Sequence, residues 1–226
     1  MKKCLFCDSP LNKELTLGFL LSFKKLSNDL LCKSCFNKFE LINSNHRCII
    51  CGRSGDFEDE KCSDCLRWLA LDNSLINKSF FNYNDSMKEY MQRYKFNGDY
   101  RLRKIFQNYF KKELNSDKIV VPIPVSKSTL KRRGFNQVEG FLDGIEYSDI
   151  LSVKYDEKVT HSTQSRIDRI KTKQFFVIKN NMKNLIIDKD LIIVDDVYTT
   201  GTTMRLAYSL LISNGAKSVQ GLTLAR

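Results

Sequence analysis

Hydrophobic and polar residues follow two different periods in the second part of the chain. Short apolar runs that end at prolines or polar residues are typical of buried strands. Three segments are predicted to be strands: residues 119–124, 191–194 and 218–225. Apolar positions three and four residues apart predict amphipathic helices over residues 99–114 and 202–214, and residues 136–147 also suit a helix. Strands that alternate with helices predict an α/β domain with a mainly parallel sheet.

The eight cysteines all lie between residues 4 and 65, in four Cys-x-x-Cys pairs. These pairs are Cys4/Cys7, Cys32/Cys35, Cys48/Cys51 and Cys62/Cys65. Two thiolates three positions apart bind one metal from a tight turn, and two such turns complete a tetrahedral zinc site. Four pairs therefore predict two structural zinc sites, in a double zinc-ribbon module over residues 1–70. Either the first pair combines with the second and the third with the fourth, with spacers of 24 and 10 residues, or the pairs cross-brace.

A disulfide framework or a redox site would use the same cysteines differently. Disulfides persist in oxidising compartments, which a protein usually reaches through a secretory signal. The first residues include two lysines but no apolar stretch behind them, so the sequence does not predict such a signal. A redox Cys-x-x-Cys motif usually occurs once, near a βαβ unit. No run approaches the ~18 consecutive apolar residues that a membrane span requires. We therefore expect a cytoplasmic protein whose cysteines bind zinc.

Positive charge is concentrated in the second part of the chain. The 226 residues include 37 Lys and Arg against 26 Asp and Glu, a net charge of +11. Up to Ala70 the counts are 11 and 9, so the predicted domain over residues 71–226 carries +9. Hydrophobic residues make up 42% of the chain, which is ample for a core and excludes disordered and collagen-like classes. The charge predicts an anionic partner: a phosphorylated metabolite, a nucleic acid or an acidic surface.

Residues 194–203 (VDDVYTTGTT) join a predicted strand to a predicted helix. A turn of small and hydroxyl-bearing residues at a helix N-terminus offers backbone N–H groups and the positive end of the helix dipole to an anion. Asp195 and Asp196 stand at the carboxyl end of the strand, where open α/β sheets bind ligands. These carboxylates would repel a bare polyphosphate, but they suit a ligand that also carries hydroxyl groups. The segment therefore predicts a sugar-phosphate site.

The same ten residues resemble the phosphoribosyl-pyrophosphate (PRPP) signature of type I phosphoribosyltransferases. Residues 120–137 (VVPIPVSKSTLKRRGFNQ) resemble the Val-Pro-x-Pro to Arg-Gly-Phe-Asn-Gln segment of the ComF family, and with the cysteine pairs the resemblance covers essentially the whole chain. It implies a parallel-sheet, type I phosphoribosyltransferase-like α/β domain preceded by a small zinc-ribbon module. It also implies a cytoplasmic factor in natural transformation that handles incoming single-stranded DNA, with a helicase-like ATPase as partner.

The resemblance assigns roles to individual residues. Asp195 and Asp196 become the catalytic pair that binds the ribose 2- and 3-hydroxyls. Magnesium accompanies the pyrophosphate of PRPP, since it commonly binds through substrate phosphates. The residues expected to hold the phosphates of PRPP are Tyr198, Thr199, Thr200, Gly201, Thr202, Thr203, Lys131, Arg132 and Arg133.

Two departures from the transferase pattern leave turnover open. Thr199 stands where purine-salvage transferases carry a carboxylate that serves the base. Residues 161–176 occupy the place of the mobile flap but lack the family's Glu-Arg to Asn pattern. The alternative function is therefore a phosphoribosyltransferase that transfers phosphoribose from PRPP to an unidentified base or amine.

Binding of nucleic acid would depend on basic clusters and on aromatic residues near them. Tyr83, Tyr90, Tyr94 and Phe96 lie among cations, and they either stack on bases or pack in the core. The residues predicted to contact nucleic-acid phosphates are Arg101, Arg103, Lys131, Arg132 and Arg133.

Overall fold

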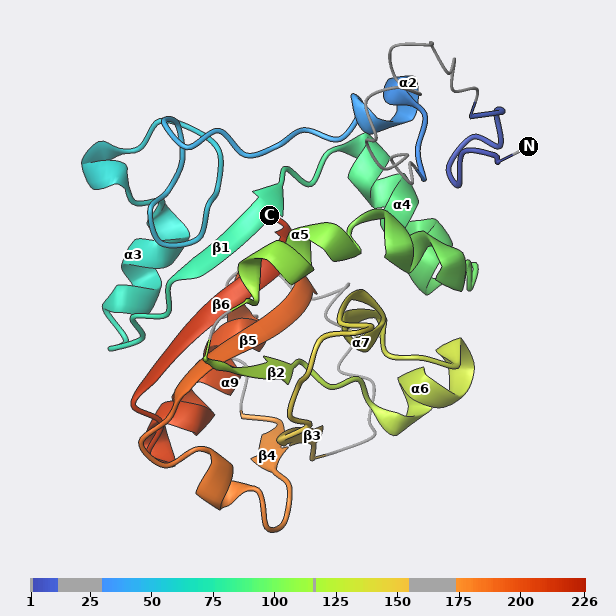
Figure 1. The fold of residues 1–226 in the computed structure, drawn as a ribbon. Helices are drawn as coiled ribbons and strands as arrows, with labels where there is room; N and C mark the ends of the chain where they lie inside the picture. The colour runs from blue at the N-terminus through green and yellow to red at the C-terminus, as the bar shows by residue number, and fades with distance from the viewer. Residues whose placement is uncertain (1, 12–29, 116, 155–173) are drawn as a thin grey trace, which may run out of the picture.

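A four-stranded parallel sheet forms the centre of the computed structural model (Figure 1). Its strands follow the order β1 (Asn77–Phe81), β6 (Ser218–Ala225), β5 (Asp190–Val197) and β2 (Ile119–Pro122). A separate antiparallel pair is formed by β3 (Leu151–Val153) and β4 (Phe176–Ile178). The structure describes residues 2–11, 30–115, 117–154 and 174–226. Most of the flap predicted over residues 161–176 lies outside the described residues.

Strand β5 is buried on both faces of the sheet, and its side chains enter two separate hydrophobic clusters in alternation. Ile192 and Val194 belong to the first cluster, whereas Leu191 and Ile193 belong to the second. Successive side chains of a strand point to opposite faces of the sheet. Each face must therefore be covered by other elements, as is usual for parallel sheets.

Aromatic side chains fill the first cluster. The elements that cover this face are α4 (Asp85–Lys95), η2 (Tyr100–Ile105), α5 (Gln107–Glu113) and α7 (Gln137–Phe141). The ring centroid of Phe106 lies 4.9 Å from those of Phe81 and Tyr90, in the tilted and edge-to-face arrangements that aromatic pairs prefer. Figure 1 shows α5 in front of the sheet, on this face.

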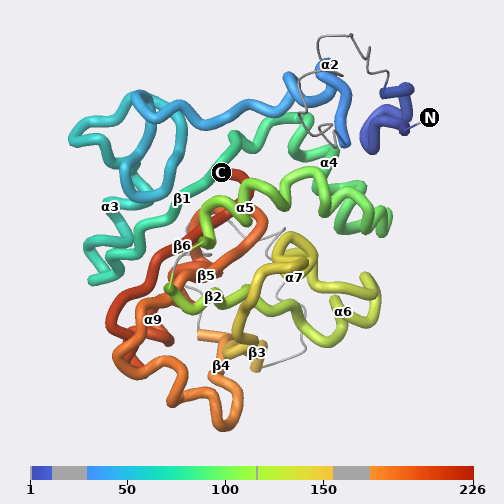
Figure 2. Tube along the Cα trace, viewed as in Figure 1, coloured from blue at the N-terminus to red at the C-terminus, as the bar shows by residue number. Residues whose placement is uncertain are grey.

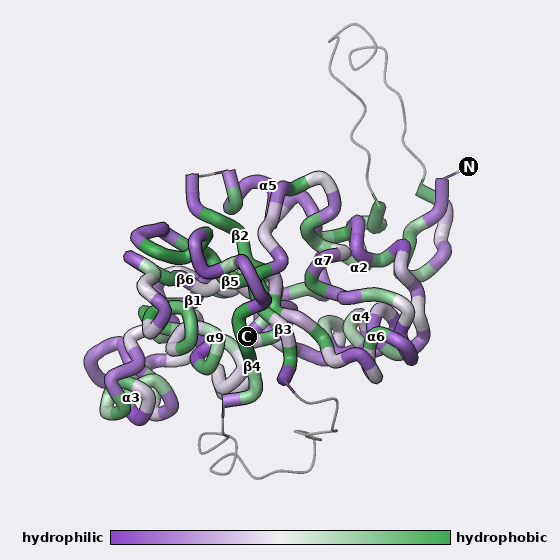
Figure 3. Tube along the Cα trace, turned by 90° about the horizontal axis from the view of Figure 1, so that it is seen from below, coloured by the Kyte–Doolittle hydropathy of each residue, from purple (hydrophilic) through white to green (hydrophobic). Residues whose placement is uncertain are grey.

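The second cluster lies between the sheet and α9 (Thr202–Ser213), which is behind the sheet in Figure 1. Met204, Ala207 and Leu211 are buried there at helical spacing. The turn η3 (Lys183–Leu185) precedes β5. Figure 3 shows hydrophobic stretches along β2 and β4, towards the middle of the molecule.

The cysteine-rich segment forms three short elements: α2 (Lys33–Phe36), η1 (Glu58–Glu60) and α3 (Ser63–Leu69). Cys4 and Cys35 belong to the first cluster, with Phe39, whereas Cys48 and Cys62 belong to the second. Hydrophobic packing thus continues across residue 70, and the division of the chain at that residue stays a prediction.

Residues between the two halves of the cysteine-rich segment run beside β1, as Figure 2 shows in blue and cyan. Leu41 forms an antiparallel bridge with Phe81, and the Asn77 N–H donates to the Ile50 carbonyl at 2.7 Å. The outer edge of β1 is therefore covered by this stretch of chain.

The predicted strands and the final helix are confirmed, with β5 longer at both ends than residues 191–194. A continuous helix over residues 99–114 is wrong, because η2 and α5 are separate elements that meet at Phe106, with φ −110° and ψ 0°. Phe106 is fully buried among aromatic rings, so packing rather than helix propensity sets its backbone. The helix suggested over residues 136–147 is reduced to α7, and Gly144 adopts φ +77° beyond it.

A close contact explains why Gly140 lies within α7. A Cβ at this position would overlap the Tyr94 phenol oxygen and lie 3.2 Å from Tyr100 Cε2. Although Ala favours helices over Gly, we expect Gly140→Ala to lower the free energy of unfolding by about 1–3 kcal/mol, the usual cost of overpacking. Chemical denaturation measures this change. Adding Tyr94→Phe should recover part of the loss, and an alanine variant as stable as the parent would contradict the contact.

Candidate functional site

The turn between β5 and α9 (residues 198–203, the threonine turn) presents the N-terminus of a helix. Gly201 adopts φ +81° just before α9, a left-handed conformation that glycine accepts without strain. Thr199 is exposed, whereas Thr200 and Thr202 are buried with their hydroxyl oxygens 2.9 Å apart. Within the described residues no side chain caps α9, and its first turn holds no acidic residue. An anion here would meet backbone N–H groups and the positive end of the helix dipole.

Asp195 and Asp196 lie near the end of β5, and both side chains are buried. The Asp196 N–H donates to Asp195 Oδ1 at 2.8 Å. Burial and the neighbouring Asp196 charge raise the pKa of Asp195 well above its ordinary value. Burial also opposes ionisation of Asp196, but the Lys95 charge and hydrogen bonds outweigh it and hold the pKa of Asp196 below its ordinary value. Asp196 therefore ionises more readily than Asp195.

Two side chains hold the Asp196 carboxylate from different elements. Lys95 Nζ, at the end of α4, forms an ion pair with Asp196 Oδ2, and Gln137 Nε2 donates to Asp196 Oδ1 at 3.1 Å. The Gln137 Oε1 atom in turn accepts a hydrogen bond from Arg133. Arg133, which belongs to the predicted phosphate-binding set, is thus connected to Asp196 through the Gln137 side chain.

The segment Arg-Gly-Phe-Asn-Gln joins α6 (Lys127–Arg133) to α7 and fixes the position of Gln137. Gly134 ends α6 with φ +84°. Phe135 packs its ring centroid 5.2 Å from that of Tyr94. Asn136 Oδ1 accepts from the Val138 N–H and so caps α7. Helix end, ring packing and helix cap together bring Gln137 to Asp196.

The basic residues predicted to bind nucleic acid lie on two neighbouring elements, η2 and α6. Tyr100 of η2 packs its ring centroid 4.8 Å from that of Phe135, which lies between α6 and α7, so η2 contacts the segment that directly follows α6. Lys131 and Arg132 are exposed, and Arg133 is half-buried. Arg101 pairs with Asp99 at 3.0 Å and Arg103 with Asp143 at 3.4 Å, which partly neutralises the η2 cations.

Two exposed aromatic rings each carry an arginine on one face. The Arg133 guanidinium lies 5.8 Å from the ring centroid of Phe96, which is 69% exposed, and that of Arg103 lies 4.0 Å from Tyr100. Such pairs gain cation–π attraction while leaving ring surface accessible. Tyr90 and Tyr94 are fully buried, so base stacking is wrong for these two and core packing is confirmed. Tyr83 is exposed.

A cleft of 390 Å³ opens beyond the end of β2. Its wall combines the loop after β2, parts of α6 and α7, strand β3, and the residue that follows β4. The lining residues are Pro124, Val125, Lys127, Leu130, Asn136, Glu139, Asp149, Leu151, Ser152, Val153, Lys154 and Lys179. Three lysines and two carboxylates suit this cleft to a small polar molecule.

The eight cysteines form two groups of four, and within each group the sulfur atoms lie within 4.8 Å of one another. The first cysteine group is Cys4, Cys7, Cys32 and Cys35, and the second is Cys48, Cys51, Cys62 and Cys65. The sequential combination is confirmed, and the cross-braced alternative is wrong. All eight cysteines are free of disulfides. Hydrogen bonding with Ser9 lowers the pKa of Cys7 to about 6, which favours the thiolate that metals bind.

Two known proteins match almost the whole chain. Competence protein ComFC of Streptococcus pneumoniae is 36% identical over 228 residues, with 99% of this chain and 100% of that protein covered. Competence protein ComFC of Bacillus subtilis is 33% identical over 236 residues, with 99% of this chain and 94% of that protein covered. The chain belongs to the ComFC family. A family model of the phosphoribosyl transferase domain matches residues 99–226, so the predicted fold class is confirmed for this ComFC relative.

Solved structures overlap the ComFC fold only in part. The allosteric regulatory enzyme of purine biosynthesis aligns with a TM-score of 0.35 and 21% identity, over 54% of this chain and 25% of its own. A hypoxanthine phosphoribosyltransferase from Staphylococcus aureus aligns with a TM-score of 0.32 and 20% identity, over 57% of this chain and 62% of its own. In the described part of the chain, no helix is both long and apolar enough to cross a membrane.

Sequence reasoning missed several residues of this site. Lys95 and Gln137 contact Asp196 directly, and Trp68 and Arg226 donate to backbone carbonyls of the threonine turn. The Arg-Gly-Phe-Asn-Gln motif was the one available signal, and it points to Gln137. Tyr198 belonged to the predicted phosphate set, but its side chain is buried beneath Gly201, and its N–H already donates to the Ala225 carbonyl.

The two aspartates should respond oppositely to neutralisation. Asp195→Asn should raise the free energy of unfolding at pH 7, because a buried carboxyl group with a raised pKa costs stability above its unfolded pKa of about 3.9. This gain should shrink as the pH falls towards 4. Asp196→Asn should lower the free energy of unfolding by about 3–5 kcal/mol, since it leaves Lys95 without its buried partner. Denaturation of both variants at pH 7 and pH 4 tests this, and equal effects would refute the opposite pKa shifts of the two aspartates.

Proposed function

We propose that this ComFC relative is a cytoplasmic factor of natural transformation that binds incoming single-stranded DNA and holds a PRPP-type sugar phosphate at the threonine turn. One observation carries the proposal. The contacts from Arg133 through Gln137 to Asp196 join the exposed arginine-faced rings to the buried acidic pair. The competence relatives support the biological role, and a helicase-like ATPase is the proposed partner.

In the proposed sugar-phosphate site, the end of β5 binds the ribose and the turn before α9 binds the phosphate. Asp195 and Asp196 would bind the ribose hydroxyls as the catalytic pair. The threonine turn would hold the 5-phosphate through backbone N–H and hydroxyl groups, because an anion is stabilised at a helix N-terminus. Magnesium would enter with PRPP and neutralise its pyrophosphate. Lys95 keeps Asp196 ionised and therefore able to accept a hydroxyl hydrogen bond.

The proposed DNA surface combines cations with exposed rings. Single-strand binding proteins use a basic groove for the phosphates and aromatic faces for the bases. Phe96 and Tyr100 supply two exposed rings, each beside an arginine. Lys131 and Arg132 supply exposed charge on α6. The net charge of +9 over residues 71–226 agrees in sign with this role.

The geometry of both cysteine groups suits zinc. A tetrahedral zinc ion with Zn–S bonds of about 2.3 Å separates its sulfur ligands by about 3.8 Å. The Sγ atoms of Cys7 and Cys32 are 3.7 Å apart, and those of Cys51 and Cys62 are also 3.7 Å apart. All four positions of each group are filled by cysteine, so the proposed zinc ions are structural.

A phosphoribosyltransferase acting on a small base or amine is the second candidate function. The observation that favours it is the 390 Å³ cleft beside α6, which has room for a small acceptor. The acidic pair and the threonine turn would serve this function equally. Detection of pyrophosphate release from PRPP with a panel of bases and amines separates this candidate from a protein that only binds.

Metal analysis provides the first test of the proposal. Protein purified without chelator should contain close to two zinc ions per chain. Replacing Cys65 by serine should reduce the content to about one, because three thiolates bind zinc more weakly than four. Mass spectrometry under native conditions counts the ions. One zinc per unmodified chain would refute the assignment of one of the two cysteine groups.

Salt dependence tests the DNA surface. Anisotropy of a labelled single-stranded oligonucleotide should give an affinity whose logarithm falls linearly with log salt, by roughly 0.7 per phosphate contact. Arg132→Ala should reduce that slope by about one contact and weaken binding for every sequence. Phe96→Ala should instead remove affinity that persists at high salt.

Lys183→Ala is the matched control, because it removes an exposed cation from η3, on a different element. It should leave the slope unchanged. The full chain is used, since both cysteine groups share hydrophobic clusters with the sheet. Absence of binding at low salt, or equal losses for Arg132→Ala and Lys183→Ala, would reject this DNA surface.

A further inference from the structure

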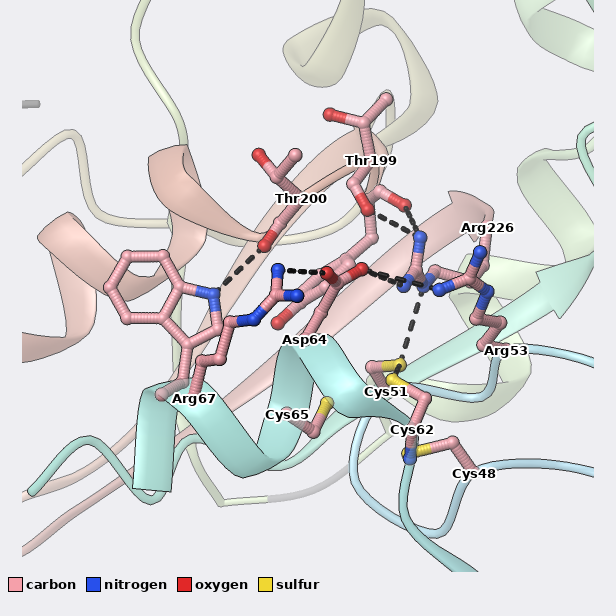
Figure 4. Close-up of polar contacts among 12 residues, drawn as sticks. Cys48, Cys51, Arg53, Cys62, Asp64, Cys65, Arg67, Thr199, Thr200 and Arg226 are labelled. Atoms are coloured by element: carbon pink, nitrogen blue, oxygen red, sulfur yellow. Dashed lines mark hydrogen bonds and ion pairs between the residues drawn. The ribbon is translucent and has the colours of Figure 1, made fainter. Parts of the chain in front are cut away.

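We infer that the second cysteine group positions the threonine turn, so that metal bound by these four cysteines increases the affinity of the turn for a phosphorylated ligand. The ligand part of this inference rests on the proposed function. Figure 4 shows Arg226 between the Cys51 sulfur and the backbone of the turn. Trp68 donates to the turn from the helix that carries Cys65.

Arg226 makes the shortest connection between the two sites. Its Nε donates to Cys51 Sγ at 3.3 Å, while its Nη1 donates to the Tyr198 carbonyl at 3.1 Å and also to the Thr199 carbonyl. The guanidinium is only 7% exposed and lies 3.8 Å from Asp64 of α3. One buried cation thus contacts a predicted metal ligand and two consecutive peptide groups of the turn.

Trp68 of α3 holds the next peptide group. Its indole Nε1 donates to the Thr200 carbonyl at 2.9 Å. The helix that carries Trp68 also carries Cys65 and begins directly after Cys62. The position of this indole therefore depends on the same loop that the second cysteine group closes.

Arg205 of α9 connects the two sites from the other side. It donates through Nη2 to Cys65 Sγ at 3.7 Å and through Nε to the Tyr198 phenol oxygen at 2.9 Å. A Cβ on Gly201 would overlap that phenol group. The Tyr198 ring therefore lies directly beneath the turn, and Arg205 fixes it there.

These contacts orient the groups that a phosphate would use. In a trans peptide the carbonyl of one residue and the N–H of the next point in opposite directions. When the carbonyls of residues 198, 199 and 200 are held towards Arg226 and Trp68, the N–H groups of Thr199, Thr200 and Gly201 point away from them. Among the described residues, no hydrogen-bond acceptor is found for these three N–H groups. Three consecutive donors are thus arranged for an anion.

Metal occupancy controls how strongly the arginines are held. Four thiolates around one zinc ion leave a net charge of −2, which attracts the guanidinium groups of Arg226 and Arg205. Without the metal, nothing would hold the four sulfur atoms of the second cysteine group around one point. The arginines would then lose their sulfur partners, and the turn would lose its supports.

Three variants test the connection. Arg226→Ala removes the link to two carbonyls, Trp68→Phe removes one donor with little change in shape, and Arg226→Lys keeps the charge with fewer donors. Arg93→Ala is the matched control, because Arg93 also donates to two consecutive carbonyls, those of Leu5 and Phe6, but beside the first cysteine group. Zinc content is measured for each variant and should stay near two ions per chain.

Hydrogen exchange of the peptide over residues 198–205, read at the Tyr198 and Arg205 amides that donate to the Ala225 and Gly201 carbonyls, gives a readout that needs no ligand. Arg226→Ala should accelerate exchange there about tenfold, the size expected for loss of charge-assisted hydrogen bonds, and Trp68→Phe should act in the same direction. Arg226→Lys should lie between the parent and Arg226→Ala, and Arg93→Ala should change nothing in this peptide. Unchanged exchange in both Arg226→Ala and Trp68→Phe would overturn the inference.

Calorimetry with PRPP and magnesium supplies the ligand readout. Affinity should fall about tenfold in Arg226→Ala, and because coupling is reciprocal PRPP should raise the zinc affinity of the parent but not that of this variant. Parent protein that binds PRPP while Arg226→Ala binds equally well would overturn the inference and leave the proposed function intact. If the parent protein does not bind PRPP but exchange is still faster in Arg226→Ala, the proposed sugar-phosphate site is rejected. The inference that the second cysteine group positions the turn is then supported.

Discussion

Strand β5 has no side that faces solvent, and this constraint organises the rest of the molecule. Its backbone groups pair with β6 on one side and β2 on the other, so its side chains need apolar partners on both faces. One layer comes from α9 and the other from the aromatic helices. The strand ends in two buried carboxylates, and buried charge requires a partner. Lys95 and Gln137 meet that requirement from the aromatic layer, which places the candidate site where the strand leaves the core.

The same two-layered sheet explains how the cysteine-rich segment is attached. The first cysteine group contributes to the aromatic cluster, and the second contributes to the cluster on the α9 side. Each attachment also includes an arginine that donates across the contact. Arg93 donates to the Leu5 and Phe6 carbonyls beside the first group, and Arg226 donates to Cys51 Sγ of the second. The cysteine groups are therefore part of the support of the sheet, although their sequence pattern alone suggested an independent module.

The sequence predicted those features that depend on neighbouring residues. The strands, α9 and the two cysteine groups follow from periodicity and spacing, and the turn before α9 follows from its small hydroxyl residues. The break at Phe106 could not be predicted, because it results from rings contributed by α4 and β1. Nor could the partners of Asp196, since 59 residues separate it from Gln137 and Lys95 lies farther away along the chain. Burial likewise decided which aromatic residues are available for stacking: Phe96 is exposed, whereas Tyr94, two residues earlier, is fully buried.

The covered edge of β1 has a consequence for the behaviour of the protein in the cell. An outer strand exposes a row of unpaired N–H and C=O groups that can pair with another chain and start aggregation. Here Leu41 and Ile50 lie against that edge, and the stretch that contains them runs from the first cysteine group into the second. Metal ions bound at both groups would anchor this stretch at its two ends. Under zinc starvation or thiol oxidation, the anchored stretch would be released and the strand edge uncovered, so damaged molecules would associate with one another instead of remaining as dispersed inactive chains.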